Sequence, residues 1–384
     1  MAKSPKSSTT RSRPSSKSTA ARDTRTAAKI VTLAQGVVKT SFAGKEPAIA
    51  IPTRSRSNTI WNRKRRILEM GDARASRELF NLNQAKQFMQ TLLHSNSVRE
   101  LIDADKTLSL RGMFYKGLHT IVGTKSEKTF ADQDESDGIL EDLEVALGAL
   151  REELHIFAKK AGTMVGNITI VDSGDEIDCR RMGSGGYAIP SIVEPDILKI
   201  KKCEAKFVLH VEKGTVWSRF NEDRFWEKHN CILTEGAGQP PRGVRRLLKR
   251  LNEEHGLPIY CLLDCDPWGH YIYSVIKQGS ISLAFESERL AIPDAKFIGI
   301  RAKDYVACAL TDDVKIELND NDRKRAREIA AYPWFEAHKG WQKEIAGLLA
   351  NGFKMEVESL ITKDISYVTE EYVPQRLKAQ DWLE

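Results

Sequence analysis

The sequence predicts a mixed α/β protein in which a helical module precedes a sheet domain. Two apolar runs, Val208–Val211 and Ile259–Leu263, lie between turn signals and are each followed by acidic residues. Short runs of this kind are typical of buried strands in a parallel sheet. From Lys206 onward, strand and helix patterns alternate, as they do in α/β domains. Between Asn81 and Ile121 the patterns are instead helical. We therefore expect two folded parts of different architecture.

The composition is that of a globular protein rather than a membrane protein. The chain has 384 residues, 41% of them hydrophobic, and a formal net charge of +6. No apolar run is long enough to span a bilayer, and no apolar segment follows the start as in a signal peptide. Six scattered cysteines show no metal-site spacing, which predicts reduced thiols. We expect a cytoplasmic protein with no membrane partner, and the charge favours a polyanionic one.

The N-terminal region has the composition of a disordered basic tail. Met1–Thr26 is rich in Ser, Thr, Lys, Arg and Pro, and Asp23 is its only acid. Such a segment cannot bury a core. We expect residues 1–57 to be a tail and linker with one helical piece around Ile30–Val38, and folded structure to begin near Asn58. The tail either keeps the protein soluble or loosely contacts nucleic-acid phosphates.

The helical module carries an exposed tyrosine in its last helix. Apolar residues recur at helical spacing in Asn81–Leu93, Ser97–Asp105 and Leu108–Leu118. Three such helices resemble a helix-turn-helix module, whose last helix approaches a DNA groove. Tyr115 lies beside the apolar stripe of that helix, and Arg111 precedes it by one turn. The simpler alternative is a tyrosine at the edge of the core with a solvated arginine.

The middle of the chain predicts a helix followed by strands. A glycine-rich stretch, Met182–Gly186, lacks the Lys-Ser/Thr ending of a phosphate-binding loop, so we expect a hairpin turn there. The remaining expected elements are a loop at Glu127–Gly138, a helix at Ile139–Ala161, strands at Asn167–Asp172, Tyr187–Val193 and Phe297–Arg301, and a helical stretch at Ile329–Asn351.

Three acidic residues follow the predicted strands of the sheet domain. Glu212 comes directly after the first run, and Asp264 and Asp266 end the second. Ligands of parallel sheets gather beyond the carboxyl ends of the strands. Two carboxylates spaced Asp-x-Asp on an extended segment point to the same face. Three hard oxygen donors in one cleft predict a Mg²⁺ site.

A basic helix is predicted between the two strands. The loop Gly236–Arg242 leads into an amphipathic helix that stops at Gly256. Arg242, Arg245 and Arg246 fall on its polar face. They either lie on a solvated face or form a track for DNA phosphates.

A tyrosine next to a DNA-binding module and a Mg²⁺ site together predict DNA cleavage. A tyrosine oxygen can attack a backbone phosphorus and hold the broken end as a phosphotyrosine ester, which keeps the energy needed for resealing. A phenol has a pKa of about 10 and needs a neighbouring base, cation or metal for activation. Tyr115 is the candidate nucleophile, and Arg111 would neutralise the same phosphate. Mg²⁺ held by Glu212, Asp264 and Asp266 would stabilise charge on the phosphoryl oxygens.

These residues resemble the motifs of the A subunit of type IIB DNA topoisomerase VI, a family that includes the Spo11 recombination proteins. The family motif Arg-x-x-Tyr-Tyr is matched by Arg111–Tyr115, with Phe114 in place of the first tyrosine. The family's metal-site glutamate and Asp-x-Asp match Glu212, Asp264 and Asp266. The resemblance covers about Asn58 to Glu384.

The resemblance implies a domain order and a set of partners. It implies a winged-helix (CAP-like) domain with the catalytic tyrosine at residues 58–165, connecting strands at 166–200, and a Toprim domain with a helical elaboration at 201–384. It further implies an A-subunit homodimer that cuts double-stranded DNA with 5′-phosphotyrosine linkage. A GHKL-type ATPase B subunit would use ATP in an A2B2 heterotetramer, associated with the nucleoid.

Two other enzyme classes and a non-enzymatic role remain open at this point. A Spo11-like protein would use Tyr115 in the same way but would cut without resealing. A Toprim nuclease would use water as the nucleophile and would not need Tyr115. A DNA-binding module with degenerate chemistry is disfavoured because the tyrosine and all three acids are present.

Overall fold

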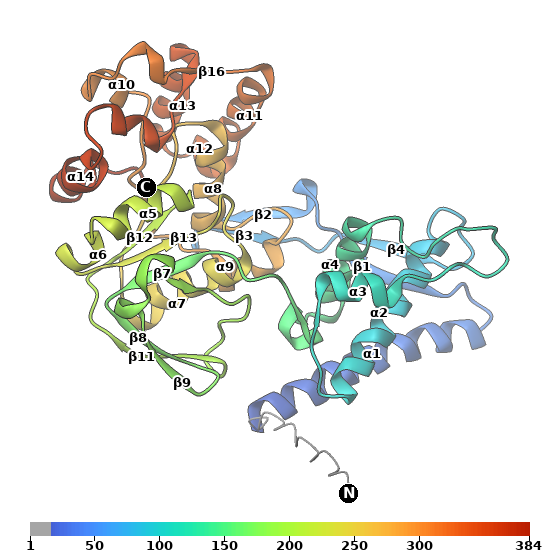
Figure 1. Ribbon diagram of the computed structural model, residues 1–384. Helices are drawn as coiled ribbons and strands as arrows, with labels where there is room; N and C mark the ends of the chain where they lie inside the picture. The colour runs from blue at the N-terminus through green and yellow to red at the C-terminus, as the bar shows by residue number, and fades with distance from the viewer. Residues whose placement is uncertain (1–16) are drawn as a thin grey trace, which may run out of the picture. The chain divides into compact units, whose positions relative to one another are not determined.

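The computed structural model describes residues 17–384 and places them in two units (Figure 1). Unit 1 consists of the described residues up to Pro52 together with Arg74–Phe157. Unit 2 consists of Thr53–Ala73 and Ala158–Glu384. The hairpin of β2 (Thr59–Asn62) and β3 (Ile67–Met70) therefore belongs to unit 2, although it interrupts unit 1 in the sequence. Our expected domain boundaries stay predictions.

The helical piece expected around Ile30–Val38 is confirmed as part of a longer helix, whereas the expectation of a disordered tail and linker around it is wrong for most of residues 17–52. Helix α1 covers Lys17–Phe42, and strand β1 covers Ala48–Pro52. Ala27 and Ile30 of α1 are buried, as are alternate residues of β1. Small and apolar residues spaced three apart give this basic segment one face that can pack. Residues 1–16 lie outside the described part of the chain.

Unit 1 is mainly helical, and its helices pack on one another (Figure 1). Strand β1 pairs antiparallel with β4, and β5 pairs parallel with β6. A core of Val98, Met113, Leu140 and Leu143 joins three of the helices. The further elements are α2 (Ala85–Asp103), α3 (Leu110–Gly117), α4 (Gln133–Leu147), β4 (Arg74–Glu78), β5 (Leu108–Ser109) and β6 (Ile156–Phe157).

Two helix predictions in unit 1 need correction. The two helices expected between Asn81 and Asp105 form a single helix, α2, because no glycine or proline interrupts this segment. Helix α4 begins before the predicted residue 139, with Asp132 as its N-cap, so the segment expected to be a loop is partly helical. It ends at Leu147 because Gly148 adopts the left-handed conformation that stops helices.

Unit 2 is built on a six-stranded sheet with a parallel centre. The strand order is β10-β7-β13-β12-β14-β15, in which β12 pairs parallel with both β13 and β14. Strand β15 continues the parallel part, whereas β7 and β10 are antiparallel. The strands are β7 (Thr163–Gly166), β10 (Tyr187–Ala188), β12 (Val208–Val211), β13 (Ile232–Glu235), β14 (Ile259–Leu262) and β15 (Lys296–Phe297).

Each face of this sheet has its own core, and the alternation of side chains along the strands explains it. Val208, Ile232 and Ile259 lie in one cluster, and Leu209 and Leu233 lie in the other. Every residue of β12 is buried. A strand buried on both faces reads as a continuous apolar run, which is why the sequence predicted it. The mixed α/β class is confirmed.

The segment expected to connect the two domains contributes strands of its own. Strand β8 confirms the strand expected at Asn167–Asp172 and lies in a three-stranded antiparallel sheet of order β11-β8-β9. The strand expected at Tyr187–Val193 extends only to Ala188, and the one at Phe297–Arg301 only to Phe297. The bounds are β8 (Ile168–Asp172), β9 (Asp175–Asp178) and β11 (Leu198–Cys203).

Helices cover the sheet, and further helices follow its last strand toward the C-terminus of the chain. Helix α7 ends at His255 and is stopped by the left-handed Gly256, as predicted. No helix in residues 17–384 is long and apolar enough to cross a membrane. All six cysteines are free. The principal helices are α5 (Gly214–Glu222), α7 (Arg242–His255), α8 (Pro267–Gln278), α9 (Ser287–Leu290), α11 (Asp320–Ala330), α12 (Pro333–Glu336), α13 (Lys339–Asn351) and α14 (Val373–Ala379).

Candidate active site in two halves

Helix α3 presents the predicted tyrosine to solvent. Ser109 caps the helix, its hydroxyl accepting a hydrogen bond from the backbone N–H of Gly112 at 3.0 Å. Met113 points into the core and is fully buried. The helix ends at Gly117, where any Cβ would lie 2.8 Å from the ring of Phe130. Tyr115, on the opposite side from Met113, keeps 58% of its surface exposed.

Arg111 is a cation in contact with the Tyr115 side chain. Its Nη2 donates a weak hydrogen bond to the Tyr115 oxygen at 3.5 Å. Its guanidinium carbon lies 5.7 Å from the centre of the Tyr115 ring. The centres of the Phe114 and Tyr115 rings lie 5.2 Å apart. The next residue, Lys116, is turned toward Glu100, to which it is bonded at 2.6 Å. Arg111 and Tyr115 therefore form an exposed pair, as their spacing predicted.

The three predicted acids lie at the carboxyl ends of the central strands. Glu212 directly follows β12, and its Oε2 accepts a hydrogen bond from the backbone N–H of Asp264 at 3.2 Å. Asp264 follows β14 and is buried. Its Oδ1 accepts from the backbone N–H of Val357 at 2.8 Å. The parallel pairing of β12 and β14 brings the first two acids together, as predicted.

Asp266 is fixed by the helix that follows it. It is the N-cap of α8, and its Oδ1 accepts from the backbone N–H of Gly269 at 2.5 Å. Pro267 takes the first helical position, where its missing N–H costs nothing. Gly269 is required because a Cβ there would lie 2.6 Å from the carbonyl oxygen of Asp264. The helix thus packs directly on the backbone of the Asp-x-Asp segment.

Burial disfavours the charged form of these carboxyl groups. Burial, together with the charge of Asp264, raises the pKa of Glu212 to about 8. Burial also raises the pKa of Asp264 to about 6, although Lys213 opposes the shift. The pKa of Asp266 is raised by burial as well. A bound cation would favour the charged form of all three.

A lysine that the sequence analysis did not single out lies in this cluster. Lys213 directly follows Glu212, and its Nζ lies 2.9 Å from Asp264 Oδ2. The same ammonium lies 3.0 Å from Glu356 and 3.4 Å from Glu358. Both glutamates belong to a segment far along the chain. No local pattern around Glu212 indicates this arrangement.

The donor set has the chemistry of a divalent-cation site, although it is not arranged as one. In residues 17–384, no group of three or more His, Cys, Asp or Glu side chains has a geometry ready to hold a metal ion. Three carboxylates at one sheet edge, two of them with pKa values raised to about 6 and 8, still fit a hard cation. Glu212, Asp264 and Asp266 are the residues that would hold it.

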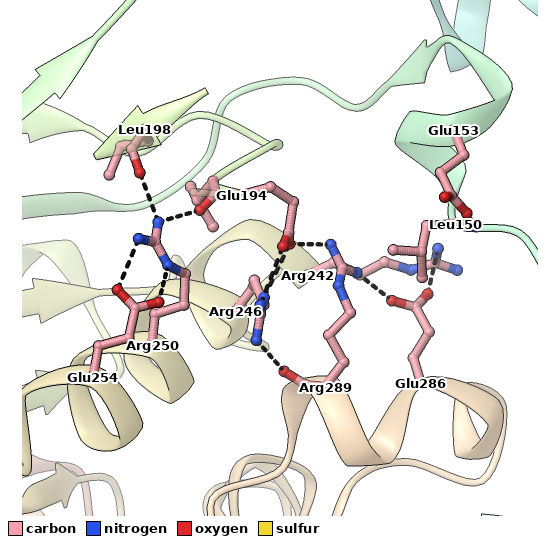
Figure 2. Close-up of polar contacts among 11 residues, drawn as sticks. Leu150, Glu153, Glu194, Leu198, Arg242, Arg246, Arg250, Glu254, Glu286 and Arg289 are labelled. Carbon is pink, nitrogen blue, oxygen red and sulfur yellow. Dashed lines mark hydrogen bonds and ion pairs between the residues drawn. The ribbon is translucent and has the colours of Figure 1, made fainter. Parts of the chain in front are cut away.

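The three arginines predicted to contact DNA do not lie on a solvated helix face. Arg246 makes a two-pronged ion pair with Glu194, at 2.9 and 3.1 Å (Figure 2). Arg242 lies 2.7 Å from the buried carboxylate of Glu286. Arg245 is buried, and burial lowers its pKa to about 10. The alternative of a solvated helix face is therefore wrong for these side chains, and their contact with DNA phosphates stays a prediction.

Arg242 and Arg246 hold neighbouring segments of unit 2 together. Arg289 of α9 bonds both Glu194, at 2.5 Å, and Glu286, at 2.7 Å, so it joins the pairs of α7 into one network (Figure 2). Arg250 donates to the backbone carbonyls of Val193 and Leu198 at 2.5 and 2.7 Å. The apolar stripe of α7 does not reveal this role, because the covering segments come from elsewhere in the sequence.

Three protein-family models match consecutive parts of the chain. A model described as the Toprim domain of the topoisomerase 6 A subunit and Spo11 matches residues 207–377. A model described as type IIB DNA topoisomerase matches residues 86–156, the part of unit 1 that carries Tyr115. A model described as the all-beta domain in the DNA topoisomerase VI alpha subunit matches residues 160–204.

Curated relatives align with nearly the whole chain. The A subunit of type 2 DNA topoisomerase 6 from Hyperthermus butylicus is 40% identical over 363 residues, covering 91% of this chain and 93% of the relative. The protein of the same name from Pyrococcus abyssi is 40% identical over 359 residues, again covering 91% and 93%. The A3 subunit of DNA topoisomerase 6 from Oryza sativa subsp. indica is 32% identical, covering 92% of this chain and 78% of the relative.

Proposed function

Because this chain belongs to the family of topoisomerase VI A subunits and Spo11 proteins, we propose that it is the DNA-cleaving subunit of a type IIB DNA topoisomerase. In this function it makes a transient double-strand break through which a second duplex passes, so that DNA is relaxed and decatenated. The observation that carries the proposal is the exposed hydroxyl of Tyr115 beside Arg111 on α3. An attacking oxygen must be accessible, and a cation beside it can bind the phosphate that it attacks.

Tyr115 is the proposed nucleophile. Its oxygen attacks the phosphorus of a backbone phosphodiester, and the bond from phosphorus to the 3′ oxygen breaks. The 3′ oxygen leaves with the bonding electrons and takes up a proton, while the phenol loses one. The 5′ phosphate is then held as an ester of Tyr115. Attack by the 3′ hydroxyl on this ester reverses the step and reseals the strand without an outside energy source.

Arg111 has the proposed role of binding the attacked phosphate. Its guanidinium lies one helical turn from Tyr115 and is exposed at the same surface. An arginine can donate two parallel hydrogen bonds to phosphate oxygens. Phe114 adds an aromatic ring beside the tyrosine but no hydroxyl, so Tyr115 is the single candidate nucleophile at this motif.

Glu212, Asp264 and Asp266 have the proposed role of holding Mg²⁺. When bound there, Mg²⁺ would offset negative charge on the phosphoryl oxygens and on the departing 3′ oxygen. The raised pKa values of Glu212 and Asp264 support this role, because burial makes their charged forms costly and a bound cation would offset that cost. The backbone N–H groups of Val357 and Gly269 orient two of the carboxylates.

The proposed partners are those that membership of the family implies. The relatives are named as A subunits, which supports a B subunit for this chain as well. We include a GHKL-type ATPase B subunit that uses ATP, an A-subunit homodimer within an A2B2 heterotetramer, and double-stranded DNA of the nucleoid as the substrate. In the dimer, each Tyr115 would work with the carboxylates of the opposite protomer.

Relaxation of supercoiled plasmid tests the proposal. The purified chain is combined with the co-encoded ATPase subunit, Mg²⁺ and ATP, and Tyr115→Phe is assayed beside the unaltered protein. ATP-dependent relaxation that the variant lacks supports a topoisomerase. Tyrosine-linked breaks without relaxation would favour a recombination-type cutter. Free ends that survive the substitution would indicate a nuclease that uses water.

A further inference from the structure

We infer that Lys213 is a counter-cation of the proposed Mg²⁺ site. When Mg²⁺ binds, Lys213 gives up its ion pair with Asp264 and keeps its ion pairs with two other acids. The ammonium holds Asp264 in place while no divalent cation is bound. It moves onto Glu356 and Glu358 when one binds. This inference rests on the proposed metal role of Asp264, and it adds a residue that governs how tightly the metal is held.

The contacts of Lys213 match the three donors of an ammonium group. Its Nζ lies within 3.4 Å of three carboxylates, those of Asp264, Glu356 and Glu358. An ammonium has three N–H donors and no acceptor, so three carboxylates can accept all of its hydrogen bonds. The side chain of Lys213 is 29% exposed, whereas that of Asp264 is only 5% exposed. The cation therefore lies between a buried acid and two more accessible ones.

Neither carboxylate oxygen of Asp264 is free of a partner while Lys213 is in this position. Its Oδ1 accepts from the backbone N–H of Val357, and its Oδ2 is the oxygen that contacts Lys213. A positive charge about 3 Å from an oxygen repels any divalent cation that approaches the same oxygen. Mg²⁺ binding at Asp264 therefore requires that Nζ of Lys213 move away from Oδ2.

Glu356 and Glu358 give Lys213 a position to occupy after the exchange. Neither belongs to the proposed metal ligands. Glu358 is held in place by the hydroxyl of Thr215, which donates to its Oε1 at 2.8 Å. Lysine has a flexible four-carbon stem and tolerates small shifts of its charge. A short movement of Nζ away from Asp264 would keep two ion pairs and free one oxygen.

Calorimetric titration of Mg²⁺ into the full-length protein without DNA tests the inference. Lys213→Met should bind Mg²⁺ about tenfold more tightly than the unaltered protein, because a competing charge is gone. Lys213→Arg should bind like the unaltered protein, since it keeps the charge. Lys249→Met is the matched control, because this lysine pairs with Glu253 and contacts none of these acids. Unchanged or weaker binding by Lys213→Met would overturn the inference.

A double-mutant cycle separates a specific exchange from general electrostatics. Replacing Glu356 and Glu358 by glutamine should weaken Mg²⁺ binding when Lys213 is present, because the lysine then has only Asp264 as a partner. The same pair of changes should have little effect in the Lys213→Met background. Equal weakening in both backgrounds would contradict the exchange. Both glutamates are accessible, so the glutamine variants should fold. Weaker Mg²⁺ binding by these variants tests the inference even if Lys213→Met does not fold.

Asp266→Asn distinguishes failure of this inference from failure of the metal site itself. If Asp266→Asn leaves Mg²⁺ binding unchanged, or the unaltered protein binds none, the proposed site is wrong and the inference falls with it. If Asp266→Asn weakens binding but Lys213→Met does not tighten it, the metal site stands and only the role of Lys213 is wrong.

Discussion

Arg111 Nη2 lies 3.5 Å from the hydroxyl oxygen of Tyr115, one turn along the same helix. Both side chains are exposed, so their contact contributes little to the stability of the fold. A pair of this kind can reorganise around a ligand at small cost. A phosphate that enters between the two would receive the guanidinium on one side and the attacking oxygen on the other.

Arg111→Ala should slow the formation of covalent DNA adducts by roughly 10- to 100-fold, because a cation that binds the attacked phosphate is lost. Arg111→Lys should recover part of the rate, since it keeps the charge but not the two-pronged geometry. Single-turnover cleavage of a labelled duplex measures both rates. The thermal unfolding midpoint should stay the same in both variants, and a rate equal to that of the unaltered protein would remove Arg111 from the mechanism.

Asp266→Asn should raise the Mg²⁺ concentration needed for cleavage and lower the maximal rate. Asparagine is as good an N-cap as aspartate, so α8 should keep its cap and the protein its fold. The change then removes only a negative charge from the carboxylate cluster. Cleavage measured across a Mg²⁺ titration tests this expectation. A titration curve that coincides with that of the unaltered protein would argue against a metal role for Asp266.

Arg246→Met should destabilise unit 2 by about 2 kcal/mol without a specific loss of DNA binding. The substitution leaves Glu194 partly buried with Arg289 as its remaining partner. Thermal unfolding and the salt dependence of DNA affinity measure the two effects separately. If Arg246 instead contacts phosphates, the salt dependence should become shallower while the midpoint stays unchanged.

His94 should make unit 1 less stable in mild acid. Its Nε2 lies 2.9 Å from the Ser136 hydroxyl, and burial lowers its pKa to about 4. Between about pH 6.5 and pH 4 the unfolded chain binds a proton at this ring that the folded chain does not. Stability from this group is therefore complete above pH 6.5 and is lost as the pH falls.

The matched measurement is urea unfolding of His94→Gln beside the unaltered protein. The stability advantage of the unaltered protein at pH 7.5 should shrink by about 2 kcal/mol at pH 5, because only that protein carries the titrating ring. His119→Gln, at an exposed histidine, serves as the control for the substitution itself. An advantage that is constant with pH would contradict a neutral buried His94.

The sequence predicted the parts of the site that depend on periodicity and strand ends. The spacing of Arg111 and Tyr115 gives their shared face on any helix, and buried parallel strands place Glu212 next to Asp264. The role of Lys213 and the burial of Arg245 depend on packing between segments far apart in the sequence. Only the piece of α1 around Ile30–Val38 was predicted, because the composition of the rest of this helix resembles that of a tail.

The central claim is that Tyr115 forms the covalent link to DNA, and mass spectrometry of a trapped adduct tests it most directly. The protein is incubated with duplex DNA, Mg²⁺, ATP and the ATPase subunit, denatured with SDS, and digested with nuclease and protease. We predict a nucleotide attached to the peptide that contains Tyr115, absent from Tyr115→Phe and retained in Phe114→Leu. A nucleotide on any other residue, or double-strand breaks with no linked peptide, would contradict the account.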